Sequence, residues 1–172
     1  MAALEAAGLG SPESLAWWLP FRYEDRRHPV PISGLSADQW ACLRVRVNAV
    51  HQRRAHRRRL SLTEAVVSDG TGSLHVVWFN QPWLERRLKA GGEVFLYGRV
   101  GLHSVRGGLR LQLESPDVEE VPSRGEAAVH SGRLVPVYHK VAALGSKRLR
   151  GLAHALLFEG PEIPEVLPQK LI

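Results

Sequence analysis

The sequence predicts a mainly β fold with short helices towards both ends. Between Trp40 and Ser115, apolar and polar residues alternate with a period of two in five short runs, as in half-buried strands. Glycine-rich turns and one short helical segment separate these runs. With 172 residues, 44 % apolar and 23 % charged, the composition is ordinary for one main globular domain plus an appendage. No apolar run reaches the roughly 20 residues of a membrane span.

The first elements precede the alternating region. Residues 11–20 predict a short helix, because Ser11 is a good cap, Pro12 suits the first turn and Pro20 ends the pattern. Residues 21–32 contain further prolines, so we expect an extended segment that packs across another surface.

The first predicted strand covers residues 42–50 and carries a basic outer face. Its two faces are set by alternation: Leu43, Val45, Val47 and Ala49 on one side, and Arg44, Arg46 and Asn48 on the other. The single cysteine, Cys42, excludes an internal disulfide and a cysteine zinc cage, and its strand context predicts a small buried residue.

The remaining elements of this region follow in order. Residues 58–69 form the second predicted strand, residues 69–72 ("DGTG") a turn, and residues 73–79 the third strand. Trp78 shares the face of Leu74 and Val76, so it is predicted to be core, whereas Phe79 has the opposite parity. A short helix over 82–92 starts at Pro82 and ends at glycine. Strands over 93–102 and 108–115 complete the set.

Five strands with a helix after the third is the element order of an OB-fold barrel, and the basic hairpins favour this fold over a small open sheet, which periodicity alone also allows. We therefore expect an N-terminal helix and extended segment (1–36), an OB-fold domain (37–121), and a linker and helix (122–172). In the last region, residues 122–133 predict a linker, 134–138 an extended piece, and 146–158 a helix whose apolar side holds Leu149, Leu152, Leu156 and Leu157.

The positive charge is concentrated in one hairpin. The chain has a formal charge of +6, from 23 Lys and Arg against 17 Asp and Glu. Residues 40–63 contain no acidic residue and seven arginines: Arg44, Arg46, Arg53, Arg54, Arg57, Arg58 and Arg59. The other residues, 16 basic and 17 acidic, nearly cancel. Such a patch indicates a polyanion partner, nucleic acid first, over a merely solvated turn.

Signatures of catalysis are missing. The sequence has no phosphate-binding loop of the form GxxxxGK[ST], no GxSxG and no HExxH. The histidines are scattered, and Asp69, the acid of "DGTG", has no second carboxylate near it in sequence to make a metal or acid–base pair. We expect neither a metal nor a cofactor in this chain.

The predicted DNA contacts come from the hairpin loops that OB-folds use for binding. Arginines hold phosphates as a bidentate fork, and aromatic rings stack on bases. The phosphate-binding candidates are the seven hairpin arginines, with Arg99, Arg106 and Arg110 extending the basic track. The stacking candidates lie in "WFNQPW", residues 78–83, where the pattern leaves open whether Phe79 and Trp83 face the core or the solvent.

Four stretches resemble one known family: "LPFRYEDRR", "SDGTGSLHVVWFNQPWL", "SGRLVPVY" and "IPEVLP", in the family's order. The chain resembles the N-terminal wedge region of the bacterial ATP-dependent DNA helicase RecG. The resemblance implies an OB-fold at the branch point of forks and Holliday-type junctions, in enzymes of DNA repair and recombination. It also implies that the aromatic pair, here Phe79 and Trp83, stacks on bases where the strands part. Trp83 replaces the usual tyrosine, which removes a hydroxyl, and His139 replaces a usual proline.

The resemblance sets further expectations. ATP and magnesium belong to motor domains that the chain lacks, so we expect DNA binding without ATP hydrolysis, whether the chain is a fragment or a motorless relative. We expect a monomer in the cytoplasm, associated with the nucleoid, and no membrane partner. Two other functions stay open: a general single-stranded DNA or RNA binder, and a docking module for a protein such as the single-strand binding protein, whose acidic tail the arginines would recognise.

Overall fold

A computed structural model describes residues 2–55, 60–105, 107–122, 128–141 and 144–160. The chain divides into two compact units. One unit comprises residues 25–133, and the other combines residues 1–24 with residues 134–172. The domain boundaries expected from the sequence stay predictions.

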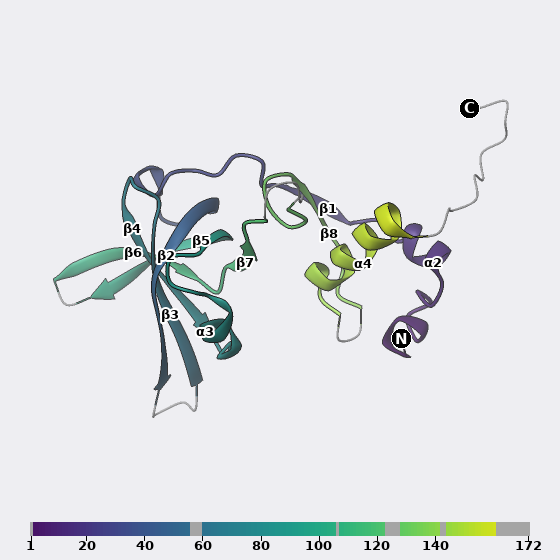
Figure 1. Cartoon of the computed structure of the whole chain (residues 1–172), viewed down its shortest axis with the longest axis horizontal. Coiled ribbons are helices and arrows are strands. Elements are labelled where there is room, and N and C mark those ends of the chain that lie inside the picture. The colour runs from purple at the N-terminus through teal and green to yellow at the C-terminus, as the bar shows by residue number, and fades with distance from the viewer. Residues whose placement is uncertain (1, 56–59, 106, 123–127, 142–143, 161–172) are drawn as a thin grey trace. The chain divides into compact units, whose positions relative to one another are not determined.

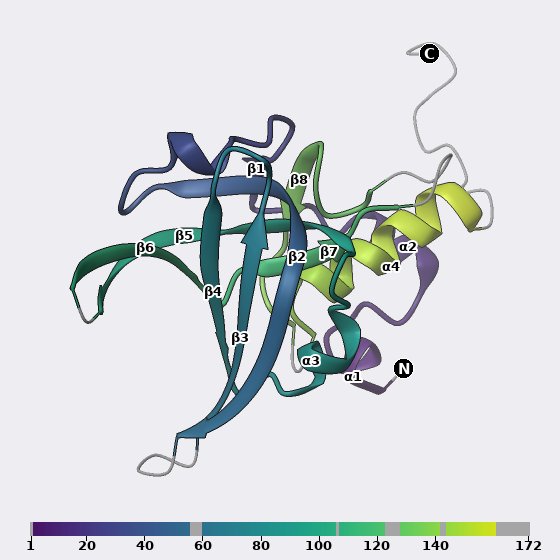
Figure 2. The same ribbon diagram turned by 60° about the vertical axis from the view of Figure 1, so that its left-hand side comes forward.

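The larger unit is a closed β-barrel of the OB type (Figures 1 and 2). Its elements are β2 (Trp40–Ala55), β3 (Leu60–Ser68), β4 (Ser73–Phe79), α3 (Trp83–Arg87), β5 (Glu93–Val105), β6 (Gly108–Glu114) and β7 (Asp117–Glu120), with the 3-10 turn η1 (Ile32–Gly34) before them. The strand order is β2-β3-β4-β6-β5-β7, and β2 also pairs with β5. That second pairing closes a ring of five strands, which confirms the barrel and excludes the open sheet.

Two elements differ from the sequence prediction. β7 was not predicted as a strand; it pairs with residues 94–97 of β5, outside the ring. The helix α3 ends at Arg87 instead of continuing to residue 92, because Leu88 already has an extended backbone (ψ 112°). The helix and its C-cap still bury Leu84 and Leu88, which are four residues apart and lie on one side of the turn.

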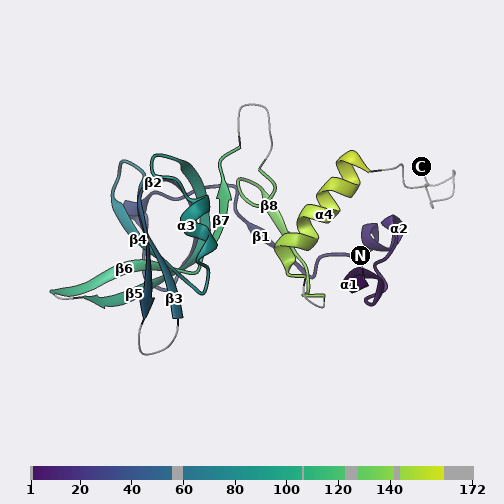
Figure 3. The ribbon, with the colours of Figure 1, turned by 60° about the horizontal axis from the view of Figure 1, so that its bottom comes forward.

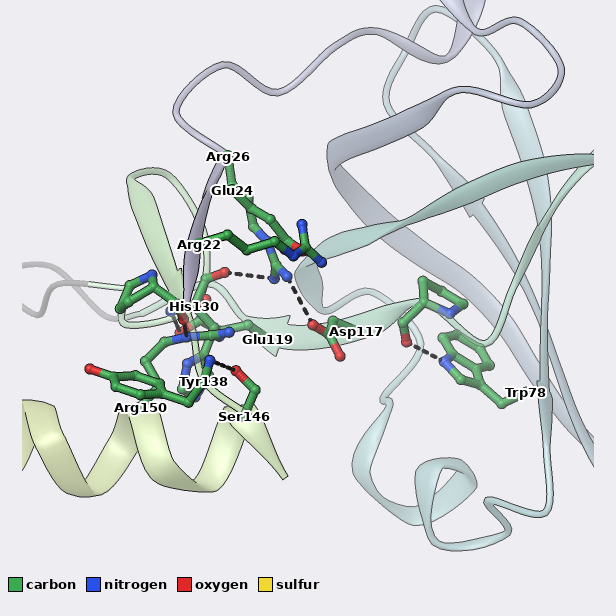
Figure 4. Close-up of polar contacts among 12 residues, drawn as sticks. Arg22, Glu24, Arg26, Trp78, Asp117, Glu119, His130, Tyr138, Ser146 and Arg150 are labelled. Carbon is green, nitrogen blue, oxygen red and sulfur yellow. Dashed lines mark hydrogen bonds and ion pairs between the residues drawn. The ribbon is translucent and has the colours of Figure 1, made fainter. Parts of the chain in front are cut away.

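The barrel core follows the predicted alternation. Trp78 is 1 % exposed, and its indole N–H donates to the carbonyl of Pro116 over 2.9 Å (Figure 4). This hydrogen bond satisfies the polar group of a buried tryptophan, so the predicted core role is confirmed. Cys42 is buried as predicted, and burial raises the pKa of its thiol.

A β-bulge interrupts the alternation of β2. The pairing with β3 shifts between Val47 and Ala49, so that Ala49 faces Val66 and Val50 faces the buried Ala65. Val50 consequently packs against the core. The prediction that Ala49 belongs to the core face was wrong, because an extra residue in one strand reverses the parity of all that follow it.

The smaller unit consists of α1 (Ala2–Glu5), α2 (Pro12–Ala16), β1 (Arg22–Asp25), β8 (Leu134–Val137) and α4 (Ser146–Glu159). Its strands β1 and β8 pair, and α4 packs against β8 and α2 (Figure 3). Ser11 caps α2 as predicted, in a reciprocal capping box with Ser14. In the described part of the chain, no helix has the length and apolarity to cross a membrane.

The apolar side of α4 is narrower than predicted. Leu149 and Ala153 are buried, whereas Leu152 and Leu157 are exposed. Leu156 is half-buried, so the buried stripe follows Leu149, Ala153 and Leu156, and Leu152 and Leu157 lie outside it. In the same unit, His139 stacks on Phe21 with ring centroids 4.3 Å apart, which gives the unexpected histidine a packing role.

Candidate nucleic-acid interface

The aromatic loop, residues 79–83, joins the end of β4 to α3 and carries two exposed rings. Phe79 is 43 % exposed and Trp83 is 58 % exposed. Among the described residues, neither ring stacks on another aromatic side chain. The structure thus decides a question that the sequence pattern left open: both rings face solvent, one and five residues beyond the buried Trp78. That they stack on DNA stays a prediction.

Strand β3 holds the first half of the aromatic loop. Asn80 has a positive φ of 55°, which asparagine tolerates better than most residues. Its N–H donates to the carbonyl of Ser61 (2.7 Å), and the Ser61 N–H donates back to Asn80 Oδ1 (3.4 Å). On the other side, the Phe79 N–H donates to Ser115 Oγ (3.4 Å). The backbone on both sides of the Phe79 ring is therefore anchored.

The second half of the aromatic loop is held at one carbonyl, that of Gln81. It accepts a hydrogen bond from the hydroxyl of Thr63 (2.9 Å) and another from the N–H of Leu84 (3.2 Å). Thr63 lies inside the barrel and Leu84 is buried beneath α3. Trp83, the first residue of α3, is thereby carried on a turn that is fastened to the barrel from two sides.

The arginine hairpin and the aromatic loop lie at the same end of the barrel, which we call the aromatic end. Arg53 faces Leu62 across β2 and β3, and Leu62 faces Phe79 across β3 and β4. Directly opposed residues of antiparallel strands share a face, so these three side chains lie on the outer face. Without the bulge after Val47, simple alternation would have turned Arg53 inward. In Figures 1 and 2, the end of β2 and the start of β3 project here as a two-stranded arm. We call this part of the arginine hairpin the arginine arm.

The described arginine of this arm has a single acidic partner. Arg53 forms an ion pair with Glu64 at 2.7 Å, with both side chains exposed. Exposed pairs of this kind contribute about 0–1 kcal/mol, so a phosphate can replace the carboxylate at little cost. Arg54 lies at the end of β2, opposite Ser61. The side chain of Arg54, and the predicted contacts Arg57, Arg58, Arg59 and Arg106 as a whole, lie outside what the structure describes.

Arg44 and Arg46 lie on β2, beside the other end of β3. We call this end of the barrel the turn end. Arg46 faces Ser68, six residues along β3 from Leu62, a separation of about 20 Å at roughly 3.3 Å per residue. Both arginines contact Glu93, at 2.8 Å and 3.8 Å. Together with the turn residue Asp69 they line a shallow groove of about 330 Å³. The two arginines thus share one carboxylate, that of Glu93, and the structure does not bring them to the aromatic end.

The Asp69 carboxylate organises the turn. It accepts hydrogen bonds from the N–H groups of Ile32, Thr71 and Gly72 and from the Thr71 hydroxyl, at 2.7–3.2 Å. Burial by itself raises the pKa of Asp69, but these hydrogen bonds outweigh it and hold the pKa below its usual value. A carboxylate so engaged is a structural group, as the tight-turn interpretation of "DGTG" predicted.

The other predicted phosphate contacts lie on β5 and β6. Arg99 pairs with Asp38 (2.7 Å) and faces the exposed Trp40 across β2 and β5. Arg110, on β6, is half-buried and lies near His75. Burial and then the Arg110 charge lower the pKa of His75, so His75 adds no positive charge near neutral pH. Arg99 and Arg110 therefore lie in separate surroundings and do not form one continuous basic track.

Sequence reasoning missed the residues that hold the aromatic loop, namely Ser61, Thr63, Asn80 and Ser115. The one available signal was Asn80 itself, an asparagine directly after a strand, where a positive φ is common. Nothing in the sequence distinguishes Thr63 from any other residue of an alternating strand.

Three comparisons place this architecture among known proteins. The model of the RecG wedge domain family matches residues 2–157. The ATP-dependent DNA helicases RecG of Thermotoga maritima and Escherichia coli K12 are each 28 % identical, over 86 % and 98 % of this chain. These matches cover 18 % and 24 % of the two helicases, so the chain spans about a fifth of their length. A solved structure of RecG bound to a three-way DNA junction superposes with a TM-score of 0.74 at 24 % identity, covering 98 % of this chain and 22 % of that one.

Proposed function

This chain belongs to the RecG wedge domain family, and from that premise we propose that it binds branched DNA, with the aromatic end at the branch point. The relatives are named as ATP-dependent DNA helicases, and one solved relative is bound to a three-way junction. The finer proposal is that the domain serves a RecG-like helicase at replication forks and Holliday junctions, in DNA repair and recombination.

One observation supports this proposal most strongly. Two exposed aromatic rings, Phe79 and Trp83, project from an anchored loop at the same end of the barrel as the arginine arm. A base is a flat apolar surface joined to a phosphate, so its recognition requires a ring and a cation side by side. The turn end offers arginines without such rings, and the buried Trp78 offers a ring without access.

The chemistry at the branch follows from these groups. Where two strands separate, the last base pair exposes one face that has lost its stacking neighbour. Phe79 and Trp83 cover such faces, while Arg53 and the rest of the arm contact phosphates on either side. Phosphate and stacking contacts carry little sequence information, so recognition is of the branch rather than of the base sequence.

The domain contributes no catalytic step of its own. Hydrolysis of ATP with magnesium is proposed for the motor domains of a longer protein, and the wedge supplies a fixed obstacle at the point where the strands part. The single-strand binding protein is a second proposed partner of such a protein.

The test compares three DNA ligands of equal length: a fork, a plain duplex and a single strand. We expect the 172-residue chain to bind the fork more tightly than either of the others at moderate salt. Replacing both Phe79 and Trp83 by alanine lowers fork affinity by about thirtyfold or more, since each stacked base contributes about 1–3 kcal/mol, and leaves duplex affinity unchanged.

The matched control is Trp17→Ala, which removes a comparably exposed tryptophan from the smaller unit. Equal affinity of the unmodified chain for fork and duplex would show that the proposal is wrong. Tightest binding to the single strand would favour a general single-strand binder instead.

A further inference from the structure

We propose that Thr63 and Asn80 are positioning residues, which fasten the aromatic loop to β3 so that Phe79 and Trp83 stand in their binding arrangement before DNA arrives. This inference rests on the proposed function, because it names the residues that prepare the stacking surface. Neither residue touches DNA in the proposal: both act through the backbone of the loop.

The anchoring of Phe79 depends on Asn80. The reciprocal hydrogen bonds between Asn80 and Ser61 extend the pairing of β3 and β4 by one residue beyond Phe79. The positive φ of Asn80 then turns the chain away from the sheet. The Phe79 ring is thus held on the last paired residue of a strand, on the outer face beside Leu62, and does not move with the turn.

The anchoring of Trp83 depends on Thr63. Its hydroxyl donates to the Gln81 carbonyl, and the same carbonyl accepts the first hydrogen bond of α3 from Leu84. A single backbone oxygen therefore joins β3 to the turn that carries Trp83. Among the described residues, no other group donates to the Gln81 carbonyl. Removal of the Thr63 hydroxyl therefore leaves this carbonyl with only the hydrogen bond from the Leu84 N–H.

The burial of Thr63 indicates that the hydroxyl has a specific role. Thr63 is 0 % exposed and its neighbours on the inner face include Ala65 and the indole of Trp78. Valine has the same shape and would fill this place without a polar atom to satisfy. A hydroxyl in such a place is favourable only through its hydrogen bond, and that bond ends on the aromatic loop.

The consequence for binding is preorganisation. A loop that is already fixed loses little conformational freedom when it contacts DNA, whereas a free loop must be ordered at the expense of affinity. Duplex binding uses phosphates and not the rings, so fixing the loop affects the fork and not the duplex. Arg53 of β2 faces Leu62 of β3, which lies between Ser61 and Thr63, so the same part of β3 supports both the arm and the loop.

The test uses the full chain with two substitutions at Thr63. Thr63→Val removes the hydroxyl and keeps the shape, whereas Thr63→Ser keeps the hydroxyl. We expect Thr63→Val to weaken fork binding about five- to tenfold with duplex binding unchanged, and Thr63→Ser to restore fork binding to within about twofold. A 2-aminopurine at the branch reports stacking directly: its quenching by the chain is reduced for Thr63→Val and retained for Thr63→Ser.

An independent variant covers the case in which the buried substitution unfolds the barrel. Asn80 is exposed, and Asn80→Gly keeps the positive φ while removing the Oδ1 acceptor and loosening the turn. We expect a chain with unchanged melting temperature and a severalfold loss of fork affinity alone. If folded Asn80→Gly binds and quenches the fork like the unmodified chain, the positioning role is overturned. If instead the unmodified chain shows no preference for the fork over the duplex, the proposed function itself is wrong.

Discussion

The two ends of strand β2 present arginines in different settings. At the aromatic end, Arg53 has one carboxylate partner, Glu64, and stands beside two exposed rings on an anchored loop. At the turn end, Arg44 and Arg46 meet Glu93 and lie in a groove with Asp69. The two ends have the same residue type on the same barrel, about 20 Å apart along β3.

Arginine content alone therefore does not define a nucleic-acid interface. The ion pairs at the two ends are alike, because all are exposed and each contributes little. What distinguishes the aromatic end is the pair of accessible rings near Arg53 and the further arginines that follow Arg53 in the sequence. Substitutions at the two ends test this contrast.

The arginine arm is expected to dominate affinity. Replacing Arg53, Arg54, Arg57, Arg58 and Arg59 by alanine lowers fork affinity by at least about a hundredfold at about 50 mM salt, because each phosphate that is no longer neutralised keeps its condensed counterions. The slope of log affinity against log salt becomes shallower by about 0.9 for each such phosphate. Fluorescence anisotropy titrations at several salt concentrations measure both quantities. An unchanged salt slope would place the bound phosphates elsewhere on the domain.

The ring at position 83 is expected to matter through its surface and not through a hydroxyl. Trp83→Ala lowers fork affinity about tenfold, within the range of one stacked base, whereas Trp83→Tyr stays within about threefold because it keeps an aromatic face. The same titrations measure this, with melting temperature as the control for folding. A tyrosine variant as weak as the alanine variant would mean that the indole makes a contact of its own.

The turn end is expected to contribute little. Replacing Arg44 and Arg46 by alanine lowers fork affinity by less than about threefold, because the two arginines share Glu93 and lie about 20 Å along β3 from the exposed rings. Glu93→Gln acts in the opposite direction and raises affinity for fork and duplex alike by about two- to threefold, since it releases two guanidinium groups. If substitutions at the turn end lower fork affinity as much as those at the arginine arm, the two ends do not differ in their contribution to DNA binding.

The smallest effect concerns the stability of the turn at acid pH. The folded pKa of Asp69 is below its usual value, so its contribution to stability is fully present above the unfolded pKa of about 3.9 and is lost as the pH falls through the folded pKa. Urea unfolding between pH 7 and pH 2 is expected to show a steeper loss of stability below about pH 4 for the unmodified chain than for Asp69→Asn. Fork binding at pH 7 is unchanged in this variant. Parallel pH profiles would mean that Asp69 does not carry the effect.

The sequence predicted more of the backbone fold than of the candidate site. The strand β4 and the core position of Trp78 followed from alternation, because a half-buried strand must place every second residue inside. The OB element order followed from five such runs and one helix, and the family resemblance is confirmed. β7 escaped prediction because only four residues pair, and the limits of α3 and α4 shifted because helix ends depend on what packs against them.

By itself, then, the sequence determined the fold class, the family and the identities of the candidate residues, since these depend on periodicity and on motifs local in the chain. Only the tertiary structure decided which candidates stand together. The bulge in β2 turned Arg53 to the face of Phe79, and Glu93, distant in sequence, came to lie against Arg44 and Arg46. Hydrogen bonds from Ser61 and Thr63 fixed a loop that begins sixteen or more residues later. Such relations arise from strand pairing between distant segments, which no local pattern specifies.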